Sequence, residues 1–183
     1  VALSFVRSPD DITGLKEKIK KAGHSANVIA TIEMPQAIVN LRDIIVESDG
    51  IMIARGDLGV ELPVEAILLI QKDIIKKCLH RAKPVIVATQ MMESMIDRTK
   101  PNRSEITDVA NAVLEGADAV MLSGETATGK YPKLVVETMT KIIVEVETKA
   151  YDYNREEMLK PQSHSPSFLS DAICYNACKL AED

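Results

Sequence analysis

Residues 50–79 read GIMIARGDLGVELPVEAILLIQKDIIKKCL, and this stretch decides the fold class. It opens with a short apolar run, Gly50 to Ala54, and a helical pattern begins at Pro63. A continuous apolar run of this length is typical of a strand that is buried on both faces, as in a parallel sheet. The stretch therefore predicts one strand followed by one helix.

The same order of strand and helix recurs on both sides of this stretch. Further strands are predicted at 1–6, 28–32, 85–88 and 119–122, and further helices at about 8–22, 35–47, 104–115, 132–146 and 168–180. Such alternation fits either an open doubly wound sheet or part of a (β/α)₈ barrel, and composition does not choose between them. The phosphate-binding pattern G-x-G-x-x-G of many open sheets is absent. Part of a barrel would leave two unpaired sheet edges.

Composition and charge narrow the class of protein. Hydrophobic residues make up 46% of the chain and charged residues 27%, which is ordinary for a globular protein. The formal net charge of -5 argues against a nucleic-acid partner, because phosphate backbones attract basic surfaces. No run of about 18 apolar residues occurs, so no membrane span is expected. Cysteines without a C-x-x-C pair are typical of a reducing compartment, which predicts a cytoplasmic protein.

Two carboxylates follow neighbouring predicted strands. Glu33 comes directly after the run that ends at Ile32, and Asp57 comes shortly after Ala54. Because the carboxyl ends of parallel strands meet at one edge, these side chains are expected to lie near each other. Two carboxylates without His or Cys suit Mg²⁺ or Mn²⁺. The alternative is a pair of solvated acids at the ends of strands.

The segment after Ala54 has a second possible use. Glycines such as Gly56 let a backbone approach a ligand, and free N–H groups can hold an anion. The Arg55 side chain could add charge, although a structural ion pair is the favoured interpretation. Thr89 follows the next strand and could offer its hydroxyl to a substrate or simply cap a helix. None of the three histidines belongs to a recognisable nucleophile motif.

Several long segments together resemble pyruvate kinase and follow the order of that family. They are residues 4–7, 32–33, 48–61, 83–95, 108–113 and 116–127. The resemblance covers nearly the whole chain and implies a partial (β/α)₈ TIM barrel, roughly strands 4–8 with their helices. The domains expected are the C-terminal half of the barrel at 1–153, a linker at 154–166 and the start of a C-terminal domain at 167–183.

The resemblance also implies an activity and a site. The family transfers a phosphoryl group from phosphoenolpyruvate to ADP, giving pyruvate and ATP, with Mg²⁺ or Mn²⁺ and usually K⁺. Glu33 and Asp57 are the implied metal ligands. Ala54, Arg55, Gly56 and Asp57 are the implied substrate-binding segment, whose backbone amides hold the substrate carboxylate, and Thr89 lies beside the substrate. A homo-oligomer, the family tetramer, is implied as well.

One position departs from the family pattern. The family has a catalytic Lys two residues before the metal-binding Glu, and this chain has Thr31 there. Losing positive charge beside the transferring group is expected to cost about 10²-fold in rate. Thr31 therefore keeps a second hypothesis open, a non-catalytic paralogue with a binding or regulatory role. A metal-dependent lyase from related barrels is a further alternative, against which the segments at 89–94 and 122–127 argue.

The chain also lacks parts that the resemblance leads one to expect. The first three barrel strands, the lid domain and most of the C-terminal domain have no counterpart in it, and the lid and early strands supply much of the nucleotide and K⁺ sites. We therefore expect a fragment of a longer enzyme that is inactive alone.

Overall fold

The computed structural model describes residues 1–149, 161 and 167–182. It divides into two compact units, Val1–Thr148 and Lys149–Asp183. The second unit contributes helix α10, Phe168–Glu182, where the sequence predicts a helix at 168–180. The expected linker at 154–166 lies outside the described residues, apart from residue 161.

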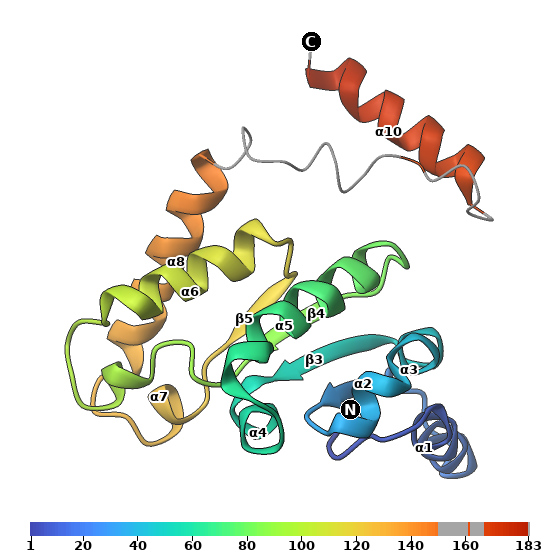
Figure 1. The fold of residues 1–183 in the computed structure, drawn as a ribbon, viewed down its shortest axis with the longest axis horizontal. Coiled ribbons are helices and arrows are strands. Elements are labelled where there is room, and N and C mark those ends of the chain that lie inside the picture. Colours follow the sequence, from blue (N-terminus) through green and yellow to red (C-terminus); the bar gives the residue numbers. More distant parts are fainter. Residues whose placement is uncertain (150–160, 162–166, 183) are drawn as a thin grey trace. The chain divides into compact units, whose positions relative to one another are not determined.

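The first unit is built on a five-stranded parallel sheet. The strands are β1 Ala2–Leu3, β2 Ile29–Ile32, β3 Gly50–Ala54, β4 Val85–Ala88 and β5 Ala119–Met121. They lie side by side in chain order (Figure 1). Doubly wound sheets reverse their strand order at a switch point, whereas barrel strands follow the chain. The order therefore favours part of a (β/α)₈ barrel over the open sheet, and β1 and β5 each have one unpaired side among the described residues.

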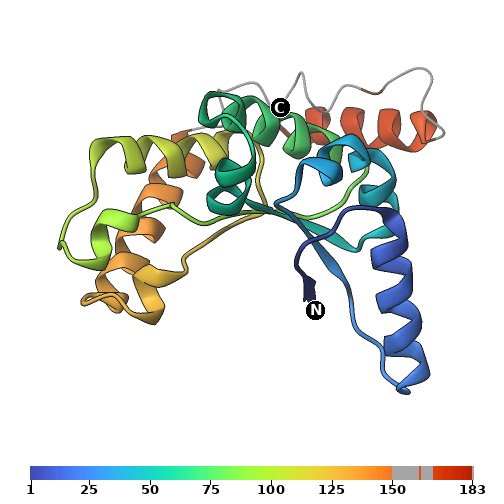
Figure 2. The ribbon, with the colours of Figure 1, turned by 60° about the horizontal axis from the view of Figure 1, so that its bottom comes forward.

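Helices follow the strands along the chain. They are α1 Pro9–Lys21, α2 Pro35–Val39, α3 Leu41–Glu47, α4 Arg55–Glu61, α5 Val64–Leu79, the 3₁₀ helix η1 Glu93–Ile96, α6 Arg103–Leu114, α7 Gly124–Ala127 and α8 Pro132–Lys149. Helix α1 contacts α3, and α3 contacts α5, so these helices cover the same face of the sheet. Figure 2 shows α1, α5, α6 and α8 following one another in chain order.

The hydrophobic core lies between this helical layer and the central strands. Ile51 and Ile53 of β3 are fully buried, as are Ile74 and Cys78 of α5. Each such isoleucine contributes about 1.5–3 kcal/mol through the apolar surface that it buries. Burial also raises the pKa of the Cys78 thiol to about 12, so this cysteine is no nucleophile at neutral pH. The edge strand β5, by contrast, has no buried residue.

Two predicted elements are shorter or more broken than expected. The strand expected at 1–6 covers only Ala2–Leu3, because Phe5 takes a left-handed backbone conformation, with φ of 57°, that no strand can contain. The helix expected at 35–47 is interrupted at Asn40, whose φ of -96° and ψ of 13° lie outside the helical region. The Asn40 side chain donates instead to the Arg7 carbonyl at 2.8 Å.

Three short helices were not predicted. They are α4, η1 and α7, with 7, 4 and 4 residues. A helix this short has too few residues to show an apolar period, so the sequence carries no signal for it. The glycine-containing segment that follows β3 is thus the helix α4.

Two aspartates fasten neighbouring strands at the amino-terminal edge of the sheet. Asp49 precedes β3, donates its N–H to the Val28 carbonyl at 2.9 Å and accepts the Val28 N–H on Oδ2 at 2.7 Å. Asp118 precedes β5 and makes the same closed pair with Val85, at 3.0 and 2.8 Å. Lys16 adds an ion pair to Asp49 at 3.0 Å. These paired bonds fix the register at the edge opposite to the predicted site.

Asp49→Asn is expected to lower the free energy of unfolding by about 1–2 kcal/mol at pH 7, since a charged acceptor is lost. The Val28 N–H, with the charges of Lys16 and Lys83, holds the pKa of Asp49 below its ordinary value of 3.8. The wild-type stability from this group is therefore present above pH 3.8 and is lost as the pH falls through the lowered pKa. Urea unfolding at pH 7 and pH 3 should show the two proteins converging in acid.

Asp73→Asn is the matched control for this test. Asp73 pairs with Lys77 on the surface of α5 and its side chain is 52% exposed, so its removal should change stability by less than about 0.5 kcal/mol. Equal losses of unfolding free energy in the two variants would contradict a special role for the paired hydrogen bonds between Asp49 and Val28.

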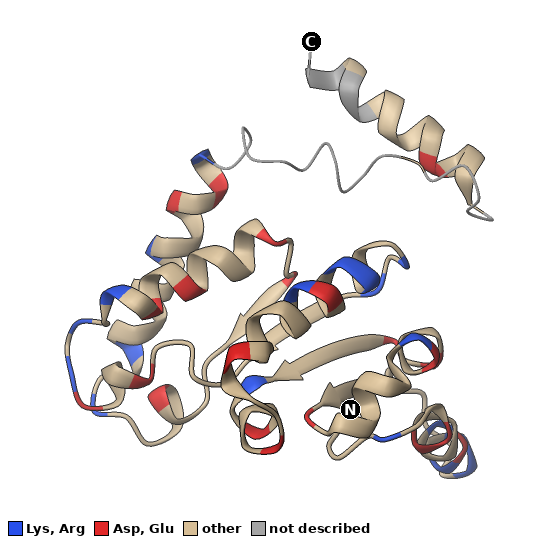
Figure 3. Cartoon of the chain, in the orientation of Figure 1, with Lys and Arg blue, Asp and Glu red and all other residues tan. Residues whose placement is uncertain are grey.

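Charges of both signs are interspersed along α1 and α5 (Figure 3). This distribution gives neither helix a surface of a single sign. Within the part of the chain that the structure describes, no helix has the length and apolar character needed to cross a bilayer.

Candidate functional site

The carboxyl-terminal edge of the sheet brings the predicted site segments together. Ile32 of β2 lies beside Ile53 of β3, and Ala54 of β3 lies beside Ala88 of β4. The residues that directly follow these strands therefore start from neighbouring positions. Ala54 itself is buried and ends β3, immediately before α4.

Glu33 is held at this edge in a defined orientation. The residue is 5% exposed, and its Oε1 accepts the Phe5 N–H at 2.5 Å. Among the described residues, no hydrogen bond uses its second oxygen, Oε2. Thr31 lies two residues earlier, within β2, and is also 5% exposed. One Glu33 oxygen is thus left for a ligand, beside the position that departs from the family pattern.

Asp57 offers a second carboxylate near this edge. It lies in the first turn of α4 and is exposed, and no hydrogen bond or ion pair in the described part of the chain involves its side chain. The described residues contain no cluster of three or more His, Cys, Asp or Glu side chains able to hold a metal. Two carboxylates are nevertheless what Mg²⁺ commonly takes from a protein, with water and substrate completing its shell. The donor set therefore fits Mg²⁺ or Mn²⁺ in the presence of a substrate.

The Arg55 side chain makes the structural ion pair favoured by the sequence analysis. Its Nη1 lies 2.5 Å from Asp108 Oδ2 in helix α6. Nη2 donates to the carbonyls of Thr89 and Gln90 at 2.9 and 3.1 Å. Arg55 is only 9% exposed. Its guanidinium is therefore engaged with the protein, and only its backbone is placed to meet a ligand.

Thr89 and Gly56 contact each other directly. The Gly56 N–H donates to Thr89 Oγ1 at 2.8 Å, and the Thr89 hydroxyl donates to the Ala88 carbonyl at 2.7 Å. The expectation that the Gly56 N–H is free is thus wrong for this structure. Thr89 caps no helix either, since η1 begins at Glu93. A side-chain Cβ at residue 56 would lie 3.3 Å from Thr89 Oγ1, so the close approach favours glycine.

Two further residues at this edge were not among the site residues expected from the sequence. Phe5 is recognised only by its left-handed backbone and its bond to Glu33. Glu125 is 3% exposed, and its two oxygens accept the N–H groups of Met92 and Ser123, which joins the segments after β4 and β5. Its place after a glycine in a polar segment gave no sign of burial.

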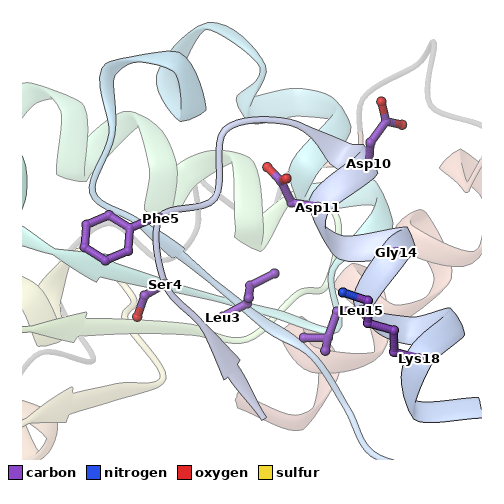
Figure 4. A pocket seen from close by; sticks show the side chains of 8 residues that line it. All are labelled: Leu3, Ser4, Phe5, Asp10, Asp11, Gly14, Leu15 and Lys18. Carbon is purple, nitrogen blue, oxygen red and sulfur yellow. The ribbon is translucent and has the colours of Figure 1, made fainter.

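The pocket in Figure 4 lies elsewhere. It has a volume of about 350 Å³ and lies between the residues at 3–5 and the first half of α1. Of the residues named above for the site, only Phe5 lines it. Neither Glu33 nor Asp57 contributes to it, so it adds nothing to the candidate site.

Comparison with known proteins identifies the family. Residues 1–136 match the family described as pyruvate kinase, barrel domain. Proteins named pyruvate kinase from Mycobacterium intracellulare and Thermotoga maritima are 50% and 46% identical to the chain, over 100% and 99% of its length. One from Leishmania mexicana is 46% identical over 95% of it. The chain spans 37%, 38% and 35% of these three relatives. With its parallel barrel strands, the chain belongs to the pyruvate kinase family and carries part of the family's barrel domain.

Proposed function

We propose that this chain forms part of an enzyme that transfers the phosphoryl group of phosphoenolpyruvate to ADP, giving pyruvate and ATP. The observation that carries the proposal is the pair Glu33 and Asp57, each with unused carboxylate oxygen, beyond adjacent strands of a pyruvate kinase barrel. The whole reaction belongs to a longer protein, because the chain spans only about a third of its relatives. We assign the ADP site, the K⁺ site and the oligomer contacts to that protein as a whole.

Glu33 and Asp57 are the proposed ligands of one Mg²⁺ or Mn²⁺. Bound there, the metal would supply electrostatic stabilisation for the enolate oxygen and for the transferring phosphoryl group. Glu33 Oε1 is already committed to the Phe5 N–H, so Oε2 is the oxygen left for coordination. Asp57 is exposed and can reach a ligand without losing a partner in the described part of the chain.

The segment from Ala54 to Asp57 is the proposed seat of the substrate carboxylate. In this structure the Gly56 N–H donates to Thr89 Oγ1, and the Thr89 hydroxyl donates to the Ala88 carbonyl. A carboxylate oxygen between them could accept both donors, so binding would exchange two internal hydrogen bonds for two charge-assisted bonds to an anion. Thr89 would then lie beside the reacting carbon and orient it, which is where positioning contributes to the rate.

The relatives and the charge of the chain support the remaining parts of the proposal. The partners are phosphoenolpyruvate or pyruvate and ADP or ATP, with neither nucleic acid nor membrane involved, and the setting is the cytoplasm. The assembly proposed is a homo-oligomer. Similarity to the pyruvate kinase relatives supports the proposed substrates, assembly and setting, and the net charge of -5 supports the absence of a nucleic-acid partner.

A coupled assay of pyruvate formation tests this function. The protein that carries these residues should form pyruvate from phosphoenolpyruvate only when ADP and Mg²⁺ are both present. The 183-residue chain alone should show no turnover, because much of the proposed nucleotide site lies outside it. Metal-dependent turnover by the isolated chain, abolished by Asp57→Ala, would overturn the second expectation. Absence of turnover in the longer protein, even with Thr31→Lys, would overturn the proposed function.

A further inference from the structure

Two consecutive residues in the candidate site have a backbone conformation that side chains disfavour. Thr89 and Gln90 have φ of 65° and 55°, in the left-handed region. For a residue other than glycine, this conformation is disfavoured by about tenfold. Such residues persist only where the surroundings hold them, and they gather at functional sites. Something at the end of β4 must therefore hold this pair.

The Arg55 guanidinium supplies the holding contacts. Its Nη2 donates to both carbonyls of the pair, at 2.9 and 3.1 Å, and its Nε adds a longer bond to the Thr89 carbonyl at 3.3 Å. Its Nη1 is fixed from the other side by Asp108 at 2.5 Å. A planar fork of several donors can make these bonds at once, which the single ammonium of a lysine cannot.

The same two carbonyls determine where the Thr89 hydroxyl points. With the backbone fixed, Oγ1 accepts the Gly56 N–H at 2.8 Å, and so faces the proposed carboxylate seat. We propose that Arg55 is a positioning residue that holds Thr89 and Gln90 in the left-handed conformation and thereby aims the Thr89 hydroxyl at the substrate. This inference rests on the proposed function for its kinetic consequences, but not for its structural ones.

Glycine provides a specific test, because it adopts the left-handed conformation without cost. Arg55→Lys should raise the hydrogen-exchange rate of the Gly56 amide by about tenfold and lower kcat/KM by about 10²-fold. Adding Gln90→Gly to Arg55→Lys should recover about tenfold of the kcat/KM loss, since one strained residue no longer needs holding. Gln90 is exposed, so its own side chain is not needed.

Ala82→Gly is the matched control. Ala82 has φ of 49° and lies between α5 and β4, at the opposite edge of the sheet. Glycine there should raise the thermal midpoint. In the Arg55→Lys background it should restore neither the slow hydrogen exchange of the Gly56 amide nor kcat/KM. Asp108→Asn leaves all the Arg55 donors in place, so it should lower kcat/KM less than Arg55→Lys does.

The experiment uses the longer protein that carries these residues, with single-residue hydrogen exchange and steady-state kinetics. Rescue by Gln90→Gly but not by Ala82→Gly would support the proposal. Equal rescue by both would mean that Arg55 acts only through general stability, and unchanged exchange at Gly56 in Arg55→Lys would also overturn it. If the protein lacks the proposed activity, hydrogen exchange at the Gly56 amide alone tests whether Arg55 holds Thr89 and Gln90. Failure of the proposed function is therefore separable from failure of this inference.

Discussion

Asp57→Ala in the protein that carries this chain is expected to lower Mg²⁺-dependent pyruvate formation by about 10³-fold. Asp57 is one of two proposed metal ligands, and the metal is proposed to stabilise charge at both reacting centres. Its carboxylate is exposed and has no partner among the residues that the structure describes, so removing it should leave the thermal midpoint nearly unchanged. Steady-state kinetics over a range of Mg²⁺ concentrations would measure the loss and any weakening of metal affinity.

Glu61→Ala is the control for that substitution. Glu61 is the last residue of α4 and, like Asp57, an exposed carboxylate of this helix. Its removal changes the net charge by the same amount without touching the proposed ligands, and it should alter the rate by less than about threefold. Similar losses in both variants would point to the general charge of α4, and an unaffected Asp57→Ala enzyme would contradict the metal site.

Thr31→Lys is expected to raise the rate of phosphoryl transfer by about 10²-fold. Thr31 is 5% exposed and lies in β2, two residues before Glu33. A lysine there would bring positive charge beside the proposed metal and the transferring group, as the family pattern does. The comparison to make is kcat for the two proteins at saturating phosphoenolpyruvate and ADP.

Thr31→Met separates charge from bulk, because methionine is long and flexible but neutral. This variant should not raise the rate of phosphoryl transfer. A rise with lysine alone would mean that the remaining catalytic groups are in place. If lysine also gives no gain while Mg²⁺ and phosphoenolpyruvate still bind, the protein would be better described as a non-catalytic paralogue with a binding role.

Much of the fold could be predicted from the sequence because buried parallel strands are short and uniformly apolar. The strands at 50–54 and 85–88 have the bounds that were predicted. The first strand was predicted too long because its apolar pattern continues through Phe5, whereas its backbone turns away to bond Glu33. The break at Asn40 likewise coincides with a contact to Arg7, which lies 33 residues earlier. Local patterns do not contain such contacts.

In the candidate site, too, the residues could be predicted from local patterns but their long-range contacts could not. Glu33, Asp57 and Thr89 could be singled out because each follows a predicted strand, and their roles came from the family resemblance. The contacts that orient them could not be predicted. Arg55 reaches Asp108 across 53 residues, and Glu125 joins two segments after different strands. These contacts depend on the closeness of elements in space, and that closeness exists only once the sheet has formed.

Mn²⁺ binding followed by electron paramagnetic resonance tests whether Glu33 and Asp57 hold a metal, since free and bound Mn²⁺ give different signals. We predict one Mn²⁺ bound per chain in the presence of phosphoenolpyruvate. We also predict that affinity falls at least about 10²-fold in the double variant Glu33→Gln, Asp57→Asn, which keeps both side-chain shapes. Binding of the same stoichiometry and affinity in that variant would contradict the assignment of Glu33 and Asp57 as the metal site, and with it the proposed phosphoryl-transfer centre.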